Sequence, residues 1–219
     1  GWDENLLEER TRTAVRMAKA AGLTCTFVTE DTVRSHPKLL ARLFHAAIDE
    51  GVDGLCLCDT VGHATPDGVF NLVYFARNLI RARGTDTRVD WHGHDDRGHS
   101  LPNALTAIEA GADRIHGTVL GMGERVGNTS LDLLMVNLKL LGIEKSDLRS
   151  LADLVHLASR ACEVSSMVIS SKKIGGTASA LSIPPRIRVI MTKLAPQLSS
   201  NCRNEVRVRV RVRVRARVR

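Results

Sequence analysis

Residues 54–96 read GLCLCDTVGHATPDGVFNLVYFARNLIRARGTDTRVDWHGHDD, and this stretch decides the fold class. It holds two short candidate strands, at 54–58 and 88–92. Between them, Thr65 and Pro66 form a helix start, a capping residue followed by proline at the first helical position. The helical stripe behind them consists of Val69, Leu72, Val73, Ala76 and Ile80. Strand, helix and strand in this order form a βαβ unit, so we expect parallel strands.

The same alternation continues on both sides of this stretch. We expect further strands at 24–29 and 114–119, so that the four strands begin 30, 34 and 26 residues apart, the size of a βα unit. Helices are expected behind residues 35–37 and behind Thr129 or Ser130. Their apolar stripes are Leu40, Leu43, Phe44, Ala47 and Ile48, then Leu131, Leu134, Met135, Leu138 and Leu141. The pattern predicts helices that cover a parallel sheet.

Every predicted strand is followed by polar side chains. They are Glu30, Asp59 with Thr60, His92 with His94, and Glu124. An open doubly wound sheet binds ligands mainly at one crevice, whereas a barrel collects groups from several strand ends. Because a whole barrel needs eight strands and about 250 residues, we predict an α/β fold that is a partial (β/α)8 TIM barrel. It would contain about the last four βα units.

We divide the chain into three predicted parts. Residues 1–145 are the second half of the barrel, 146–163 begin a helical region after it, and 164–219 are an irregular, disordered linker with a Val/Arg tail. Residues 203–219 contain eight arginines and one glutamate, so they carry the whole net charge of +7. The Val/Arg repeat fits a cationic strand, a basic arm for nucleic acid, or a translated tandem nucleotide repeat, and we favour the last. Apart from non-specific contacts of this tail, we expect no nucleic-acid partner.

The composition is that of a folded globular protein, with 43% hydrophobic and 25% charged residues. No apolar run approaches the roughly 20 residues of a membrane-spanning helix, and the first residues lack a signal-peptide layout. We therefore expect a cytoplasmic protein with no membrane partner. The five cysteines contain no C-x-x-C pair, and Cys56 and Cys58 share one predicted strand face. They are expected to be reduced structural thiols.

His92-Gly93-His94 is the sharpest chemical feature. Because side chains alternate along a strand, two histidines at i and i+2 share a face about 6.6 Å apart, and one metal ion could bridge their imidazoles. A structural histidine pair is the plainer alternative. The charged run 95–97 offers hydrogen-bond partners for the imidazoles, which favours a metal site.

Residues 121–128 read GMGERVGN and follow the last predicted strand. The glycines allow tight turns and close approach to a ligand, while Glu124, Arg125 and Asn128 supply a carboxylate, a cation and an amide. The glycine spacing is not that of a dinucleotide-binding loop. From spacing alone, a ligand-binding loop and a helix-capping turn with a surface ion pair both remain open.

Three stretches together resemble a known family: FVTEDTVRS at 27–35, LCDTVGHATPDGV at 57–69, and HGHDDRGHSLPNALTAIEAGADRIHGTVLGMGERVGNTSLDLLMVNLKLLG at 92–142. They are similar to the catalytic barrel of the 2-isopropylmalate synthases and their homocitrate and citramalate relatives, with hydroxymethylglutaryl-CoA lyases more distant. The resemblance spans roughly residues 4–163. The lyase loop carries a cysteine where this chain has Glu124 and Arg125, so the resemblance favours a condensing synthase.

The resemblance implies a role for each candidate residue. The implied metal ligands are His92, His94 and Asn128; Thr60 would bind the carboxylate of a 2-oxo acid, and Glu30 and Glu124 would be catalytic carboxylates in the pocket. The implied reaction condenses acetyl-CoA, as co-substrate, with a 2-oxo acid polarised by a divalent metal, Mn, Mg or Zn. We expect 2-oxoisovalerate as substrate, giving 2-isopropylmalate in leucine biosynthesis. Full-length members are expected to be homodimers.

The sequence also departs from the family pattern. No Asp-Thr-x-Arg-Asp strand precedes residue 1, and no histidine follows His156, so we expect a fragment or partial gene model that is inactive by itself. Homocitrate or citramalate synthesis is the alternative condensation. A non-catalytic half-barrel, binding a partner through unpaired first and last strands, is the alternative from another class.

Overall fold

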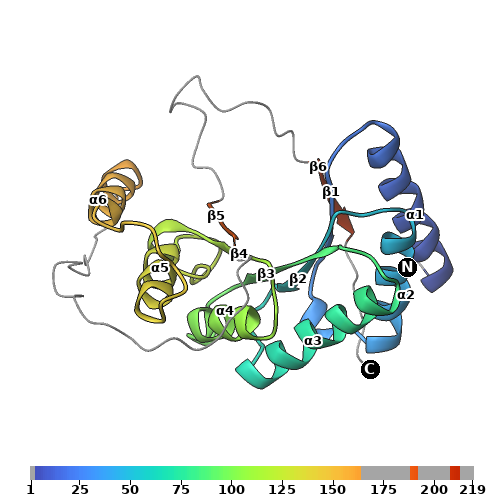
Figure 1. Ribbon diagram of the computed structural model, residues 1–219, viewed down its shortest axis with the longest axis horizontal. Helices are drawn as coiled ribbons and strands as arrows, with labels where there is room; N and C mark the ends of the chain where they lie inside the picture. Colours follow the sequence, from blue (N-terminus) through green and yellow to red (C-terminus); the bar gives the residue numbers. More distant parts are fainter. Residues whose placement is uncertain (1–2, 164–187, 192–207, 213–219) are drawn as a thin grey trace.

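The computed structural model describes residues 3–163, 188–191 and 208–212. Six parallel strands form one sheet in the order β5-β4-β3-β2-β1-β6 (Figure 1). The strands are β1 Cys25–Thr29, β2 Gly54–Asp59, β3 Arg88–Gly93, β4 Arg114–Gly117, β5 Arg188–Met191 and β6 Val208–Val212. The order β1 to β4 follows the chain, as expected when each strand is joined to the next by one helix on the same side.

In the part of the chain that the structure describes, six α-helices and two short 3₁₀ helices precede, connect and follow these strands. They are α1 Glu4–Ala20, η1 Thr32–Arg34, α2 Pro37–Asp49, α3 Pro66–Ala82, α4 Ser100–Glu109, η2 Val119–Gly121, α5 Leu131–Leu140 and α6 Leu151–Ala161. The predicted start of α3 is confirmed, because the Thr65 hydroxyl accepts a hydrogen bond from the Gly68 N–H. The expected helices behind residues 35–37 and Ser130 are α2 and α5.

The two faces of the sheet differ in chemistry. One face carries Phe27, Leu55, Leu57, Trp91 and Ile115, all fully buried in a core shared with α1 to α5. The side chains that alternate with them form the other face: Thr26, Val28, Cys56, Cys58, Asp90, His92, Arg114 and His116. Helices α1 to α4 lie along one side of the strands (Figure 1). An apolar helix-covered face and a polar inner face are the wall of a barrel, so the predicted partial (β/α)8 barrel is confirmed.

The fourth strand is shorter than expected. It ends at Gly117 rather than at residue 119, because the Thr118 N–H bonds to the carbonyl of Thr129 and the chain then turns into η2. A Cβ at position 117 would lie 2.9 Å from that same carbonyl. A small second cluster of Val119, Leu131, Val155 and Ala158 packs α6 against this turn.

The prediction of unpaired edge strands is wrong. β6 pairs in parallel with β1, and β5 pairs in parallel with β4. An edge strand offers unpaired backbone N–H and C=O groups to any extended segment. Here β5 and β6 of the same chain are the segments that pair with the two edges. Apart from these two strands, the predicted irregular part 164–219 lies outside the described residues. Cys202 also lies outside them, and the division at 145 and 163 stays a prediction.

No helix in the described part of the chain is long and apolar enough to cross a lipid bilayer.

Candidate metal and substrate site

The two histidines of the H-G-H motif face each other. His92 lies near the end of β3 and His94 directly after it, and their Nε2 atoms are 3.3 Å apart with the rings nearly perpendicular at 87°. Gly93 between them leaves room on the opposite face for the buried indole of Trp91, which a Cβ would approach to 3.0 Å. Strand alternation thus places both imidazoles together, as the sequence predicted.

Asn128 lies beside this pair. It forms an antiparallel bridge with His94, in which the Asp95 N–H bonds to the Gly127 carbonyl and the Thr129 N–H to the Gly93 carbonyl. The side chain of Asn128 occupies the space next to Gly123, where a Cβ would come within 1.9 Å of Nδ2. The loop 121–128 therefore brings Asn128 beside His94, and Gly123 provides the room for its amide.

The chemistry of these three side chains fits a divalent metal. Two nitrogens that each lie about 2.1 Å from one zinc ion are roughly 3.0 to 3.4 Å apart, and the measured separation of the Nε2 atoms is 3.3 Å. The Asn128 Oδ1 atom is buried and has no hydrogen-bond partner, and the same is true of His94 Nδ1. In the described residues, however, no three His, Cys, Asp or Glu side chains form a metal-holding group. The predicted ligands among the described residues are thus two imidazoles and one amide.

Thr60 and Glu30 lie at the ends of the two strands before β3. The Thr60 hydroxyl accepts a hydrogen bond of 2.7 Å from the Asp31 N–H, the residue after Glu30. Because a hydroxyl both accepts and donates, the Thr60 proton is available for a carboxylate. Glu30 is half-buried directly after β1. The backbone contact between 31 and 60 brings these two predicted residues to one edge of the sheet.

Glu124 lies at the tip of the 121–128 loop. Its side chain is 74% exposed, and its carboxylate is 4.0 Å from the Arg125 guanidinium. The structure therefore places His92, His94 and Asn128 together and Thr60 with Glu30, while Glu124 points into solvent beside them.

Asp59 is a residue whose work the sequence did not indicate. It is fully buried, and its two carboxylate oxygens accept hydrogen bonds from the N–H groups of His63 and Ala64 at 2.8 and 3.1 Å. Burial raises the pKa of Asp59, and the two backbone donors oppose that rise. The Asp59 carbonyl also accepts from the His94 N–H. Only the fold reveals that this carboxylate holds the turn after β2 rather than facing a substrate.

The inner face below the histidines is also polar. The Cys56 and Cys58 sulfurs are 3.8 Å apart, which confirms their shared face, and both are free thiols. His116 lies between Cys56, 3.8 Å from its sulfur, and the buried Asp90, 3.4 Å from a carboxylate oxygen. These side chains form a polar layer under the predicted metal site.

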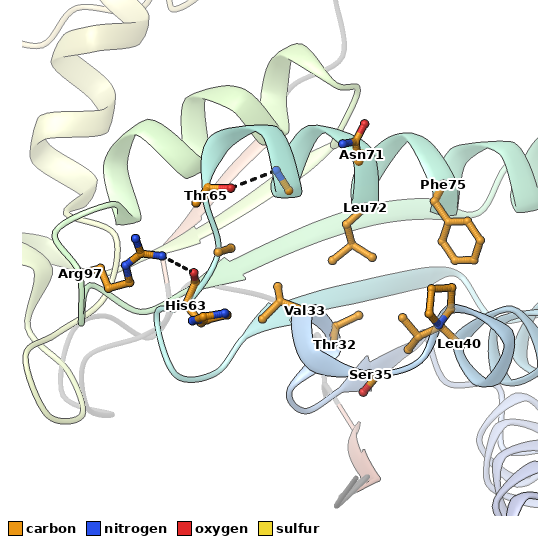
Figure 2. A pocket seen from close by; sticks show the side chains of 13 residues that line it. Thr32, Val33, Ser35, Leu40, His63, Thr65, Asn71, Leu72, Phe75 and Arg97 are labelled. Atoms are coloured by element: carbon orange, nitrogen blue, oxygen red, sulfur yellow. Dashed lines mark hydrogen bonds between the residues drawn. The ribbon is translucent and has the colours of Figure 1, made fainter. Parts of the chain in front are cut away.

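A cavity of about 440 Å³ lies between α2 and α3 (Figure 2). Val33, Leu40, Leu72 and Phe75 line its apolar part, and at its edge the Arg97 guanidinium donates a 2.8 Å hydrogen bond to the His63 carbonyl. None of the six predicted site residues is among its lining residues. The predicted site is instead defined by the strand ends.

Comparisons with known proteins find relatives of similar sequence. A 2-isopropylmalate synthase of Pyrococcus abyssi is 42% identical over 113 residues, covering 51% of this chain and 23% of that protein. An (R)-citramalate synthase of Aquifex aeolicus is 33% identical over 138 residues, covering 63% of this chain and 25% of that protein. The chain thus spans about a quarter of the length of these relatives.

A solved structure and a family model extend the comparison. The HMG-CoA lyase of Brucella melitensis has a similar fold, with a TM-score of 0.58 and 21% identity over 71% of this chain and 58% of that one. The family model described as HMGL-like matches residues 1–168. The chain therefore belongs to the HMGL-like family.

Proposed function

We propose that this chain forms the metal-binding and 2-oxo-acid-binding part of an acyltransferase that condenses acetyl-CoA with 2-oxoisovalerate to 2-isopropylmalate. The relatives named as 2-isopropylmalate and citramalate synthases support a condensing enzyme of this family. The G-E-R-V-G-N loop supports a synthase rather than a lyase, because it carries Glu124 and Arg125. The proposed metal is Mn, Mg or Zn, since mixed nitrogen and oxygen ligands suit all three.

One observation carries the proposal: the Nε2 atoms of His92 and His94 converge to 3.3 Å, and Asn128, paired with His94 across a β-bridge, has an amide oxygen that is buried without a partner. An unsatisfied buried oxygen costs free energy, roughly 1 to 3 kcal/mol, unless a donor or cation completes it. A structural histidine pair would not require the amide to be brought there by a separate loop.

The proposed roles follow from these positions. His92, His94 and Asn128 would hold the metal, which when bound supplies a Lewis acid that polarises the ketone of a 2-oxo acid. The Thr60 hydroxyl would donate a hydrogen bond to the substrate carboxylate, since its oxygen already accepts from the Asp31 N–H. Glu124 is exposed on the 121–128 loop and would exchange protons with substrate or solvent.

The choice of 2-oxo acid is the finer part of the proposal. A condensation that forms 2-isopropylmalate uses a 2-oxo acid with a branched side chain, whereas citramalate synthesis uses the three-carbon acid pyruvate. Homocitrate synthesis would need a longer acid with a second carboxylate. The 2-isopropylmalate synthase and the (R)-citramalate synthase compared above show similar degrees of identity to this chain. We propose the branched acid and treat pyruvate as its direct competitor.

Ligand-observed NMR on the 219-residue chain tests the proposal. With Zn²⁺ present, saturation-transfer signals are expected from 2-oxoisovalerate and weaker ones from pyruvate. The signals should disappear when the metal is chelated, in His94→Ala, and in Thr60→Ala. Asp67→Ala is the control, because Asp67 lies in the first turn of α3 and contributes only to the helix dipole.

Two results would contradict the proposal. Binding of 2-oxo acid that persists without metal and in His94→Ala would place the acid elsewhere. Absence of both metal and 2-oxo-acid binding in a well-folded chain would favour the non-catalytic half-barrel.

A further inference from the structure

Arg125 connects three of the strand-end segments. Its Nε atom donates to Asp96 Oδ1 at 2.7 Å, and its Nη2 atom donates to Asp96 Oδ2 at 2.8 Å and to the Thr60 carbonyl at 2.7 Å. Asp96 belongs to the turn after β3, Thr60 to the turn after β2, and Arg125 to the loop after β4. One guanidinium therefore spans the ends of three consecutive strands.

The backbone is shaped to allow these contacts. Arg125 has φ +58°, a left-handed conformation that non-glycine residues rarely adopt. Gly62 has φ +59° and packs closely against Asp96. A Cβ at position 62 would lie only 2.6 Å from the backbone nitrogen of Asp96. A side chain at position 62 would push Asp96 away from the guanidinium. The left-handed backbone at Arg125 and the absent side chain at Gly62 thus both serve the contact between Arg125 and Asp96.

The contacts continue to the first strand and to Asn128. Thr60 is held on both sides, by the Asp31 N–H at its hydroxyl and by Arg125 at its carbonyl. The base of the 121–128 loop is fixed by the backbone bridge between His94 and Asn128. Arg125 lies at the exposed tip of this loop, where it ties the tip to the neighbouring turns.

We propose that Arg125 is a positioning residue, a clasp with Asp96 and Thr60 that keeps Asn128 and Thr60 at their places on the site. Nε and Nη2 of the guanidinium are engaged within the protein, which is the geometry of a positioning group, and Nη1 lies 4.0 Å from Glu124. The role of the clasp in metal and substrate binding rests on the proposed function. Its role in fixing the loops is independent of that function.

Hydrogen exchange of the metal-free 219-residue chain tests the clasp directly. Arg125→Met is expected to raise amide exchange in 121–128 and at 60–62 about ten-fold, as for lost hydrogen bonds to a charged group. Arg125→Lys, which keeps the charge but not the bidentate fork, should recover part of the protection. Asp96→Asn should act in the same direction as Arg125→Met, with little further change in the double variant.

Arg16→Met is the matched control. Arg16 makes the same kind of exposed bidentate pair, with Glu50 at 3.0 and 2.7 Å, between α1 and the end of α2. It should leave exchange in 121–128 unchanged.

A second readout separates positioning from simple loop rigidity. If the clasp sets Asn128, Arg125→Met should weaken Zn²⁺ binding about ten-fold, as outer partners of metal ligands commonly do, while the melting temperature stays close to that of Arg16→Met. Unchanged exchange in 121–128 would overturn the clasp, and faster exchange with unchanged Zn²⁺ affinity would overturn its positioning role. If the unaltered chain binds no Zn²⁺, the proposed function fails. In that case, the ratio of amide exchange rates in 121–128 between Arg125→Met and Arg16→Met alone shows whether Arg125 fixes the loop.

Discussion

At the scale of single residues, the Asn128 amide depends on a neighbour without a side chain. A Cβ at position 123 would lie 1.9 Å from Asn128 Nδ2 and 2.8 Å from Cγ. Gly123 is exposed, so its missing side chain makes room for the Asn128 amide and not for residues of a packed core. The sequence predicted that the loop glycines permit close approach, but not that the approaching group is the loop's own asparagine.

Gly123→Ala is therefore expected to displace the Asn128 amide from the histidine pair. Zn²⁺ affinity measured by calorimetry should fall roughly 10- to 100-fold, the range for disturbed metal surroundings, with little change in melting temperature. Gly68→Ala is the matched control, because its Cβ would meet only the Thr65 hydroxyl at 3.4 Å, and it lies on α3 away from the histidines. Equal metal affinity of Gly123→Ala and the unaltered chain would show that the amide is no ligand.

At the scale of elements, helices with caps and apolar stripes were predictable, and loops were not. α3 begins at Pro66, as its capping threonine indicates, and the H-x-H pair shares a face because strand alternation requires it. The end of β4 and the turn at Asp59 depend on hydrogen bonds to residues 4 to 11 positions away in sequence. The clasp at Arg125 joins residues up to 65 positions apart. Local patterns carry no signal for such contacts.

The packing of α1 on α2 gives a pH-dependent prediction. Glu8 on α1 accepts hydrogen bonds from Arg42 on α2 and from Arg12, which lower the pKa of Glu8 below its ordinary value of 4.5. A lowered pKa stabilises the folded state above the ordinary value, and that contribution is lost as the pH falls through the lower folded value. Glu8→Gln should melt at a lower temperature at pH 7, and the difference should shrink below pH 4.5.

Thermal melts from pH 7 to pH 3 measure this difference, with the exposed neighbour Glu9→Gln as control. Because these ion pairs lie at the surface and are partly open to solvent, the effect should be small. A difference between Glu8→Gln and the unaltered chain that stays constant at all pH values would contradict the ion-pair explanation.

At the scale of the whole molecule, the sheet is apolar on its helix-covered face and polar on its inner face. Part of this division was predicted from the sequence, as the shared strand face of Cys56 with Cys58 and of His92 with His94. The pairing of both sheet edges was not. β5 comes from a part of the chain without a sustained period, and β6 comes from the Val/Arg repeat, for which a cationic strand was only one of three interpretations. In the structure, these two strands cover the backbone groups of β4 and β1.

A chain shortened to residues 1–163 is expected to associate more than the full chain. It would lose β5 and β6 and expose the backbone groups of β1 and β4 as open edges, which favours pairing between molecules. Size-exclusion chromatography with light scattering measures the change at matched concentration. Identical mass distributions of the two chains would contradict the assigned edge pairing.

The central claim is that His92, His94 and Asn128 hold one divalent metal at the ends of the parallel strands. Calorimetric Zn²⁺ titration of the unaltered chain, His92→Ala, His94→Ala and Asp67→Ala tests it most directly. We predict one bound equivalent in the unaltered chain and in Asp67→Ala, and affinity lower by roughly 100-fold or more in each histidine variant, since each loses a ligand. Unchanged affinity and stoichiometry in a folded His92→Ala or His94→Ala variant would contradict the claim.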